Sequence, residues 1–198
     1  MSGGSTETRV SVLCEGYIVR DDDARIVDAS STVTLIVSEG SLVVVDTGAY
    51  ARIDELAAAL AGADISFKEV DVVVNTHLHM DHCGGNEEFP NARRYAHRLE
   101  DAPIGTIGAE EGTEICEGVS VIETPGHTRG SISVLVRSDR DYVICGDALP
   151  TRSNYECMTP PAVHIDRRLA VSSLERVICL ADVVVPGHDP PFEVLRKM

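Results

Sequence analysis

The chain has 198 residues, and 17 Lys+Arg against 32 Asp+Glu give it a net charge of −15 with histidine neutral. This length predicts one domain over residues 1–198, since domains usually span about 100–200 residues. A hydrophobic content of 43% excludes a disordered chain, and the acidic balance disfavours nucleic acid and anionic membranes as partners.

No apolar run approaches the ~18 residues of a membrane helix, so we expect no membrane association. Residues 1–8 lack the basic start and apolar stretch of a signal peptide, and we expect them to be a flexible lead-in. The six cysteines form no CxxC pair, which favours reduced thiols and a cytoplasmic protein. The sequence does not predict an oligomeric state.

The first half of the chain alternates predicted strands with turns and one helix. Short runs rich in β-branched residues predict strands over 10–19, 32–37, 42–45 and 70–75. Apolar residues at helical spacing predict an amphipathic helix over 53–61 that ends at Gly62. The strand over 70–75 leads directly into a polar segment, 76–82.

The second half repeats this rhythm. Similar runs predict strands over 119–124, 131–136, 142–145 and 182–185. A helix precedes the last strand, with Asp166 as its expected N-cap. The alternation predicts an α/β fold built from two similar halves.

Polar side chains stand where the apolar strands give way to turns, which is where α/β proteins gather binding and catalytic groups. The segment His77-x-His79-x-Asp81-His82 offers four metal-ligating groups within six residues. Alternate residues 77 and 79 point to one side, while 81 and 82 can reach a second centre nearby. Such a short segment seldom completes a tetrahedral shell, so distant residues must contribute.

The distant candidates are each preceded by glycine, which allows the backbone to approach a site closely. These candidates are His127, Asp147 and His188. Together with the segment they make seven groups, enough for two metal ions if one carboxylate bridges. Zinc is the expected metal, and His/Asp sites also accept iron or manganese.

The same residues carry a resemblance to a known family. Asp46-Thr-Gly, segment 76–82, Pro125-Gly-His127, Gly146-Asp147 and Pro186-Gly-His188 resemble the five successive motifs of the metallo-β-lactamase-fold hydrolases. The match spans residues 46–188. It implies a four-layer αββα sandwich with a dinuclear metal site along one edge.

The resemblance also implies a role for each residue. By the family pattern, the first metal is bound by His77, His79 and His127, the second by Asp81, His82 and His188, and Asp147 bridges both. Asp46 resembles the family's first-motif aspartate, which supports ligand orientation from behind. An N-cap for a helix over 50–61 is the alternative interpretation of Asp46, and both can hold.

The expected function is that of a binuclear metal-dependent hydrolase. Two divalent ions hold a shared water and lower its pKa toward ~7, which supplies hydroxide for attack on an electrophilic carbonyl or phosphorus. Asp81 is the expected catalytic group that takes up the released proton. We expect a small-molecule substrate: an ester, thioester or lactone.

Departures from the family pattern narrow the choice. β-Lactamases usually have a cysteine ligand where this chain has Asp147, and the di-iron flavoproteins have an acidic residue where His79 stands. The ten residues after His188 leave no room for the helical domain of glyoxalase II, and no β-CASP insertion follows Asp147. The run 79–90 is most similar to the small group called metallo-β-lactamase domain-containing protein 1.

Three alternatives stay open. The chain is also similar to mononuclear iron persulfide dioxygenases, which bind one iron through the positions of His77, His127 and Asp147. A phosphodiesterase or ribonuclease has the same fold, although the net charge weighs against a polyanion. A non-catalytic binding protein is disfavoured by the intact ligand set.

Three features outside the metal set have weaker interpretations. Arg93, Arg94 and Arg98 form a basic cluster that is typical of a solvated face. The loop over 150–161 is a candidate substrate wall or a solvent-exposed loop, with Tyr155 as a candidate oxyanion donor. Cys83 is expected to be a small packed hydrophobe and not a metal ligand.

Overall fold

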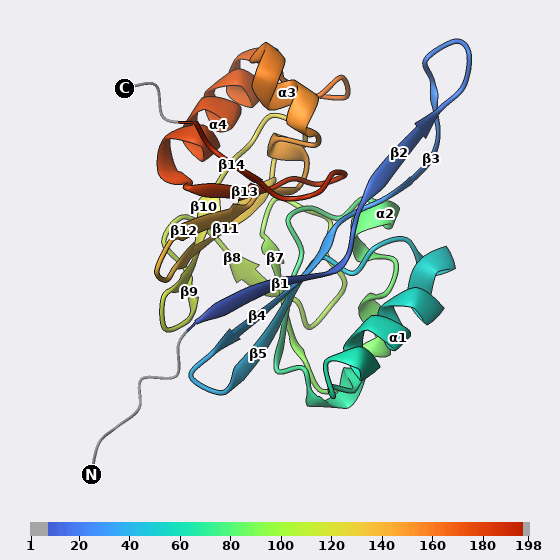
Figure 1. The fold of residues 1–198 in the computed structure, drawn as a ribbon, viewed down its shortest axis with the longest axis vertical. Helices are drawn as coiled ribbons and strands as arrows, with labels where there is room; N and C mark the ends of the chain where they lie inside the picture. Colours follow the sequence, from blue (N-terminus) through green and yellow to red (C-terminus); the bar gives the residue numbers. More distant parts are fainter. Residues whose placement is uncertain (1–7, 196–198) are drawn as a thin grey trace.

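The computed structural model describes residues 8–195 and contains two six-stranded sheets that face each other, with helices on the outside (Figure 1). The lead-in expected at 1–8 lies outside the described residues apart from Thr8. The first sheet has the order β1 (Arg9–Cys14), β4 (Val33–Ser38), β5 (Ser41–Val45), β6 (Val72–Val74), β7 (Arg93–His97) and β8 (Ile107–Ala109). The second has the order β14 (Phe192–Glu193), β13 (Val183–Val185), β12 (Asp141–Ile144), β11 (Ile132–Arg137), β10 (Val119–Glu123) and β9 (Glu114–Cys116).

Alternation along the strands of the first sheet builds two of the four layers. Val43 and Val45 of β5 belong to the core between the sheets, whereas Val44 between them packs with Leu56 and Leu60 of helix α1 (Ile53–Gly62). Successive side chains of a strand point to opposite faces, so one apolar run covers both sides of the sheet. Each of these buried side chains contributes roughly 1.5–3 kcal/mol.

The second sheet is covered in the same way. Ile144 of β12 faces the core between the sheets, and its neighbour Val143 packs with Leu174 and Val177 of helix α4 (Arg167–Leu180). Asp166 caps α4 as expected, since its carboxylate accepts hydrogen bonds from the backbone N–H groups of residues 168 and 169. The fold is therefore the expected αββα sandwich.

The two sheets share one strand connectivity. In the first, β4 and β5 are antiparallel and β6 then joins parallel to β5; in the second, β11 and β12 are antiparallel and β13 then joins parallel to β12. Both parallel strands are three consecutive valines that follow a covering helix. Each delivers a histidine-bearing turn: 76–82 after β6 and 186–188 after β13.

The predicted strand over 10–19 is two strands. The chain leaves the first sheet at residues 15 and 16, where the Gly16 N–H donates to Thr32 Oγ1 at 3.1 Å and the Thr32 N–H donates to the Gly187 carbonyl at 2.6 Å. The second part, β2 (Tyr17–Arg20), pairs with β3 (Ile26–Ser30) as a separate hairpin that projects from the body (Figure 1). We call residues 17–30 the β2–β3 hairpin.

The short strands β7, β8 and β9 have no counterpart in the sequence prediction. They are three to five residues long, and only part of each is buried, so no clear alternation marks them. The remaining elements are short helical turns near the ligand-bearing edge or between strands: η1 (Tyr50–Arg52), η2 (Phe67–Glu69), α2 (Met80–Cys83), η3 (Asn86–Glu88), η4 (Gly146–Ala148) and α3 (Arg152–Cys157). Within residues 8–195, no helix has the length and apolar character needed to cross a membrane.

Candidate metal centre

The seven residues expected to bind metal come together at one edge of the sandwich. Within the described part of the chain, their ligand atoms form three groups of three residues. Within each group, the ligand atoms lie within 4.8 Å of one another. One is the three-histidine group, His77, His79 and His127; another is the mixed group, Asp81, His82 and His188; the third is His77, His82 and Asp147.

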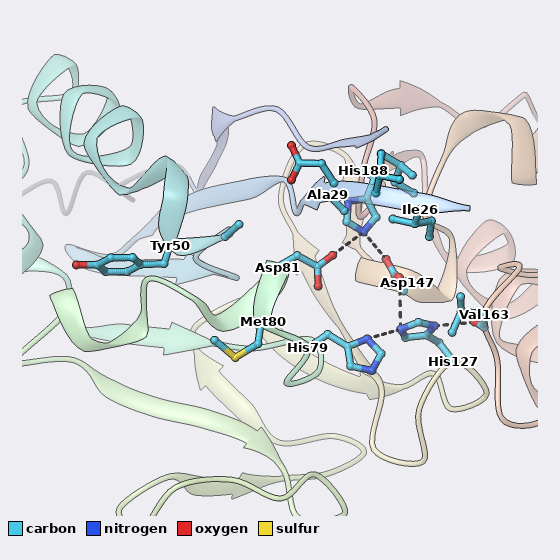
Figure 2. Close-up of a pocket in the computed structure, with 14 residues that line it drawn as sticks. Ile26, Ala29, Tyr50, His79, Met80, Asp81, His127, Asp147, Val163 and His188 are labelled. Carbon is cyan, nitrogen blue, oxygen red and sulfur yellow. Dashed lines mark hydrogen bonds and ion pairs between the residues drawn. The ribbon is translucent and has the colours of Figure 1, made fainter. Parts of the chain in front are cut away.

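Asp147 lies between the three-histidine group and the mixed group (Figure 2). Its Oδ2 is 3.4 Å from His127 Nε2, and its Oδ1 is 3.1 Å from His188 Nε2 and 3.4 Å from His82 Nε2. Oδ1 is buried and makes no hydrogen bond of regular geometry in the described structure, so its neighbours there are the ring nitrogens of His188 and His82. A cation between these three groups would satisfy the buried carboxylate and the imidazole lone pairs together.

The ring nitrogens of the three-histidine group have the spacing of a metal shell. His77 Nε2 lies 3.0 Å from His79 Nδ1 and 3.2 Å from His127 Nε2, and the last pair is 3.0 Å apart. Tetrahedral zinc with Zn–N bonds of about 2.0–2.1 Å places its ligand nitrogens roughly 3.3 Å apart. The residues present therefore fit a divalent ion.

Three of the imidazoles have their outer nitrogen engaged, which leaves the inner Nε2 free to bind a metal. His127 Nδ1 donates to the Val163 carbonyl at 2.7 Å, and His188 Nδ1 donates to the Ser30 carbonyl at 3.0 Å. Such contacts fix the tautomer and orient the ring. Sequence reasoning missed both partners because a backbone carbonyl carries no residue-type signal.

Asp46 engages the third imidazole. Its Oδ2 lies 2.7 Å from His82 Nδ1 and accepts a hydrogen bond from Thr76 Oγ1 at 2.8 Å, while Oδ1 accepts from the Thr76 N–H at 2.8 Å. Asp46 has a left-handed backbone, with φ of 55°, a conformation that aspartate tolerates. The helix-capping interpretation is wrong, because α1 begins after Arg52 and has no side-chain cap.

Burial and neighbouring charges shift the pKa values of the histidines in different directions. Burial lowers the pKa of His77 well below its usual value, and it lowers the pKa of half-exposed His79 as well. Burial also acts on His82, but the carboxylates of Asp46 and Asp147 outweigh it and hold its pKa well above normal. The pKa of Asp147 is well below its usual range because His188 and His82 outweigh the opposing effect of burial.

Two glycines allow the second sheet to reach the centre. A Cβ on Gly187 would lie 2.6 Å from Asp147 Oδ1, and a Cβ on Gly146 would lie 2.3 Å from Thr76 Oγ1. Gly146 also has a positive φ of 46°. Any side chain at these positions would push the ligand-bearing turns apart.

A cavity of about 580 Å³ opens directly onto the metal centre (Figure 2). Its polar side is made by His79, Asp81, His127, Asp147 and His188, and Asp28 also lines it. The rest of its wall is apolar or aromatic: Ile18, Ile26, Val27, Ala29, Ala49, Tyr50, Met80 and Val163. The β2–β3 hairpin supplies much of this wall, which the sequence did not predict because its residues lie far in sequence from every metal-ligand motif.

The candidate wall over 150–161 is placed elsewhere. It contains α3, and the Tyr155 ring packs against Phe192 at a centroid distance of 5.0 Å. The Tyr155 hydroxyl accepts a hydrogen bond from the Leu195 N–H at 3.0 Å, and Tyr155 does not line the cavity. Neither the candidate oxyanion role of Tyr155 nor the candidate wall role of this segment is supported by this placement.

The basic cluster of Arg93, Arg94 and Arg98 does not contribute to the cavity either. Arg94 pairs with Glu87 at 2.5 Å, Arg98 pairs with Glu110, and none of the arginines in the described part of the chain lines the cavity. Cys83 lies next to His82, but burial raises the pKa of its thiol to about 11, and its Sγ is 3.6 Å from the Leu78 carbonyl. A protonated thiol that faces a carbonyl matches the expectation that Cys83 is not a ligand.

Comparison with known proteins decides the family. The family model described as the metallo-beta-lactamase superfamily matches residues 26–112 and 98–188. The chain belongs to the metallo-β-lactamase superfamily. It shares 36% identity over 188 residues with a Methanocaldococcus jannaschii protein named Probable metallo-hydrolase, covering 92% of this chain and 88% of the relative.

Other superfamily members are similar over most of the chain. Metallo-beta-lactamase domain-containing protein 1 of Xenopus laevis is 31% identical, with 94% of this chain and 82% of the relative covered, as the run at 79–90 indicated. An N-acyl homoserine lactonase of Bacillus sp is 30% identical over 59% of this chain and 55% of its own length. An AiiA mutant of B. thuringiensis, crystallised with N-decanoyl-L-homoserine at its active site, has a TM-score of 0.71 at 20% identity, covering 92% and 93%.

These relatives and the superfamily identify the chain as a metal-dependent hydrolase, as expected from the motifs. The His/Asp cluster that such enzymes need is present at one edge of the sandwich. The structural similarity at 20% identity concerns the fold alone.

Proposed function

We propose that this chain is a binuclear metal-dependent hydrolase that cleaves a small lactone, ester or thioester with an apolar substituent. The observation that carries the proposal is the shared boundary between the seven-residue cluster and a largely apolar cavity (Figure 2). Small-molecule sites typically combine such an apolar lining with a few convergent polar groups.

The proposal assigns the three-histidine group to one ion, the mixed group to a second, and Asp147 to both. Zinc is the expected metal because imidazole and carboxylate suit it, with iron or manganese as alternatives. When bound, the ions would supply Lewis acidity and lower the pKa of a water molecule, so that hydroxide is available at neutral pH.

The residues of the chain then position substrate and protons. The carboxylate of Asp81 borders the cavity and is 28% exposed, so a water or substrate oxygen can reach it. We assign Asp81 the role of accepting the proton released during attack, a function that typically contributes 10²–10⁴-fold. The β2–β3 hairpin, Met80 and Val163 would hold the apolar substituent and limit access of bulk water.

The charge of the cavity favours a carbonyl compound over a phosphodiester. Within residues 8–195, no lysine or arginine lines it, and Asp28 adds a further negative group. Enzymes that bind phosphates or nucleic acids usually surround them with cationic side chains. The similarity to an N-acyl homoserine lactonase supports a lactone as the first substrate to test.

The mixed group supports two ions over one. A mononuclear iron enzyme needs only the positions of His77, His127 and Asp147, whereas Asp81, His82 and His188 also converge within 4.8 Å.

We place this activity in the cytoplasm, where the six free cysteines would remain reduced.

A substrate panel tests the proposal. The zinc-loaded protein should hydrolyse γ-lactones and thioesters with kcat/KM rising as the alkyl substituent lengthens, and a chelator should abolish turnover. Bis(p-nitrophenyl) phosphate and a β-lactam should be poor substrates. Faster turnover of the phosphodiester than of every lactone, ester and thioester would contradict the proposal.

A further inference from the structure

Glu100 lies behind the three-histidine group and joins the two loops that carry it. Its Oε2 accepts a hydrogen bond from the Leu78 N–H at 3.1 Å. Its Oε1 accepts from Thr128 Oγ1 at 2.6 Å and from the Gly130 N–H at 3.2 Å. Both oxygens of one carboxylate are thus used, each on a different loop.

The groups that donate to Glu100 lie next to the histidines of the three-histidine group in the sequence. Leu78 stands between His77 and His79, on the loop that follows β6 of the first sheet. Thr128 directly follows His127, on the loop that follows β10 of the second sheet. A single carboxylate therefore sets the spacing between two loops whose ring nitrogens must stay 3.0–3.2 Å apart.

Gly130 is a second, independent sign that the loop is built around this carboxylate. A Cβ on Gly130 would lie 2.8 Å from Glu100 Oε1 and 3.0 Å from both Glu100 Cγ and the Glu100 backbone nitrogen. Gly130 has no positive φ that would itself require glycine. The missing side chain thus leaves room for Glu100.

We propose that Glu100 is a positioning residue that holds the 77–79 loop and the 127–130 loop at the separation a metal ion requires. Because Glu100 touches none of the three histidine rings in the hydrogen bonds described, it acts through the backbone on either side of them. Residues that orient metal ligands in this way typically change metal affinity 10–100-fold when mutated. The role toward the ion rests on the proposed function, whereas the tie between the loops belongs to the chain itself.

Glu100→Gln is a sharp test because it preserves size and removes one acceptor. Its amide has a single acceptor oxygen, so either Leu78 or Gly130 must place its N–H against an NH₂ group. Gly130→Ala should displace the Glu100 side chain without changing its chemistry. Glu111→Gln is the matched control, since Glu111 accepts from the Glu123 N–H and from Arg176 but touches no ligand-bearing loop.

Two measurements on the full chain separate the possible roles. Stepwise Zn²⁺ affinities, measured by competition with a chromophoric chelator, should show one ion bound about 10-fold or more weakly in Glu100→Gln and Gly130→Ala. The other stepwise affinity should stay within about threefold, since none of the hydrogen bonds described for Glu100 reaches the mixed group. Amide hydrogen exchange of the metal-free protein should be faster at Leu78 and Gly130, and Glu111→Gln should match the wild type in both measurements.

Each contrary result has a defined meaning. Wild-type Zn²⁺ affinities and exchange rates in Glu100→Gln would overturn the positioning role while leaving the proposed function intact. Equal weakening of both ions in the two variants would show a general structural effect and would also overturn it. A wild-type chain that binds none of Zn²⁺, Fe²⁺ and Mn²⁺ would overturn the proposed function and, with it, the role of Glu100 toward the ion.

Discussion

The three-histidine group and the mixed group differ in how they are prepared for a cation. Burial lowers the pKa of His77 and His79, so these imidazoles are neutral near pH 7 and have their lone pairs free. His82 lies between Asp46 and Asp147, and its pKa is held well above normal. Metal binding at the mixed group must therefore displace a proton, because a metal-ligating histidine has to be neutral.

This difference teaches that two sites can be unlike even though each takes two ligands from segment 77–82 and one from the second half of the chain. The three-histidine group takes two ligands from one extended segment and relies on backbone ties behind them. The mixed group depends on the buried Asp46–His82 pair, whose Oδ2–Nδ1 distance is 2.7 Å. We expect the mixed group to bind its ion with the steeper dependence on pH.

The largest expected effect on metal binding comes from the residue that both groups share. Asp147→Asn should lower metal content and esterase-type turnover together, with kcat/KM falling at least ~100-fold, because a neutral amide replaces the carboxylate that faces both groups. Elemental analysis and lactone kinetics check this. The exposed turn variant Asp139→Asn is the control, and unchanged metal content in Asp147→Asn would contradict the bridging role.

Asp81→Asn separates the two groups. It should lower kcat by about 10²–10⁴-fold, since the variant loses the proposed proton acceptor. It should also weaken one ion and spare the ion of the three-histidine group. Stepwise metal titration beside steady-state kinetics measures both effects, and loss of both ions together would show that the groups are not separable.

Asp46→Asn sharpens the comparison because it removes the charge beside His82 and keeps the Oδ1 that accepts from the Thr76 N–H. We expect the affinity of the mixed group for its ion to fall about 10–100-fold, as for other groups that orient a metal ligand. The three-histidine group should keep its affinity. Equal weakening at both groups would mean that Asp46 acts on the fold of the whole edge, not on His82.

The sequence predicted the metal centre better than it predicted the cavity. All seven ligand candidates carry residue-type signals and stand where predicted strands give way to turns, and the resemblance to the family implied how they group. The hairpin wall did not follow, because Ile26 and Val27 are 43% and 61% exposed and resemble ordinary surface residues. Tyr155 is the opposite case, because the sequence suggested a role in the site that the structure does not support. Its ring lies outside the cavity although Tyr155 is close to Asp147 in sequence.

The pH dependence of metal-free stability tests the charge state of the mixed group. Because the folded-state pKa of His82 is raised, its stabilising effect is fully present below the unfolded pKa of about 6.5 and is lost as pH rises through the folded pKa. The Tm advantage of the metal-free wild type over His82→Gln should therefore shrink as pH rises from 6 to 9. Each kcal/mol corresponds to about 2–4 °C.

This prediction fails if the advantage grows across the same range. The lowered pKa of His77 gives a contribution of the opposite sign: stability falls as pH drops below about 6.5, because the unfolded chain takes up the proton. The contribution of His77 is present in both the wild type and His82→Gln. It therefore cancels in the Tm difference to the extent that His77 and His82 titrate independently.

The smallest expected effect is that of Cys83→Ser. The thiol is half-buried, belongs to none of the ligand groups of residues 8–195, and has its pKa raised to about 11 by burial. The variant should keep both ions and wild-type turnover within about twofold. Loss of both ions on this substitution would overturn the seven-residue ligand set.

The most direct test of the central claim is the metal stoichiometry of the wild-type chain, measured by elemental analysis while turnover of an alkyl-substituted lactone is followed during metal titration. The account predicts two divalent ions per chain and turnover that reaches its maximum only when the second ion binds. One iron per chain, with no second ion at saturation and no lactone turnover, would contradict it.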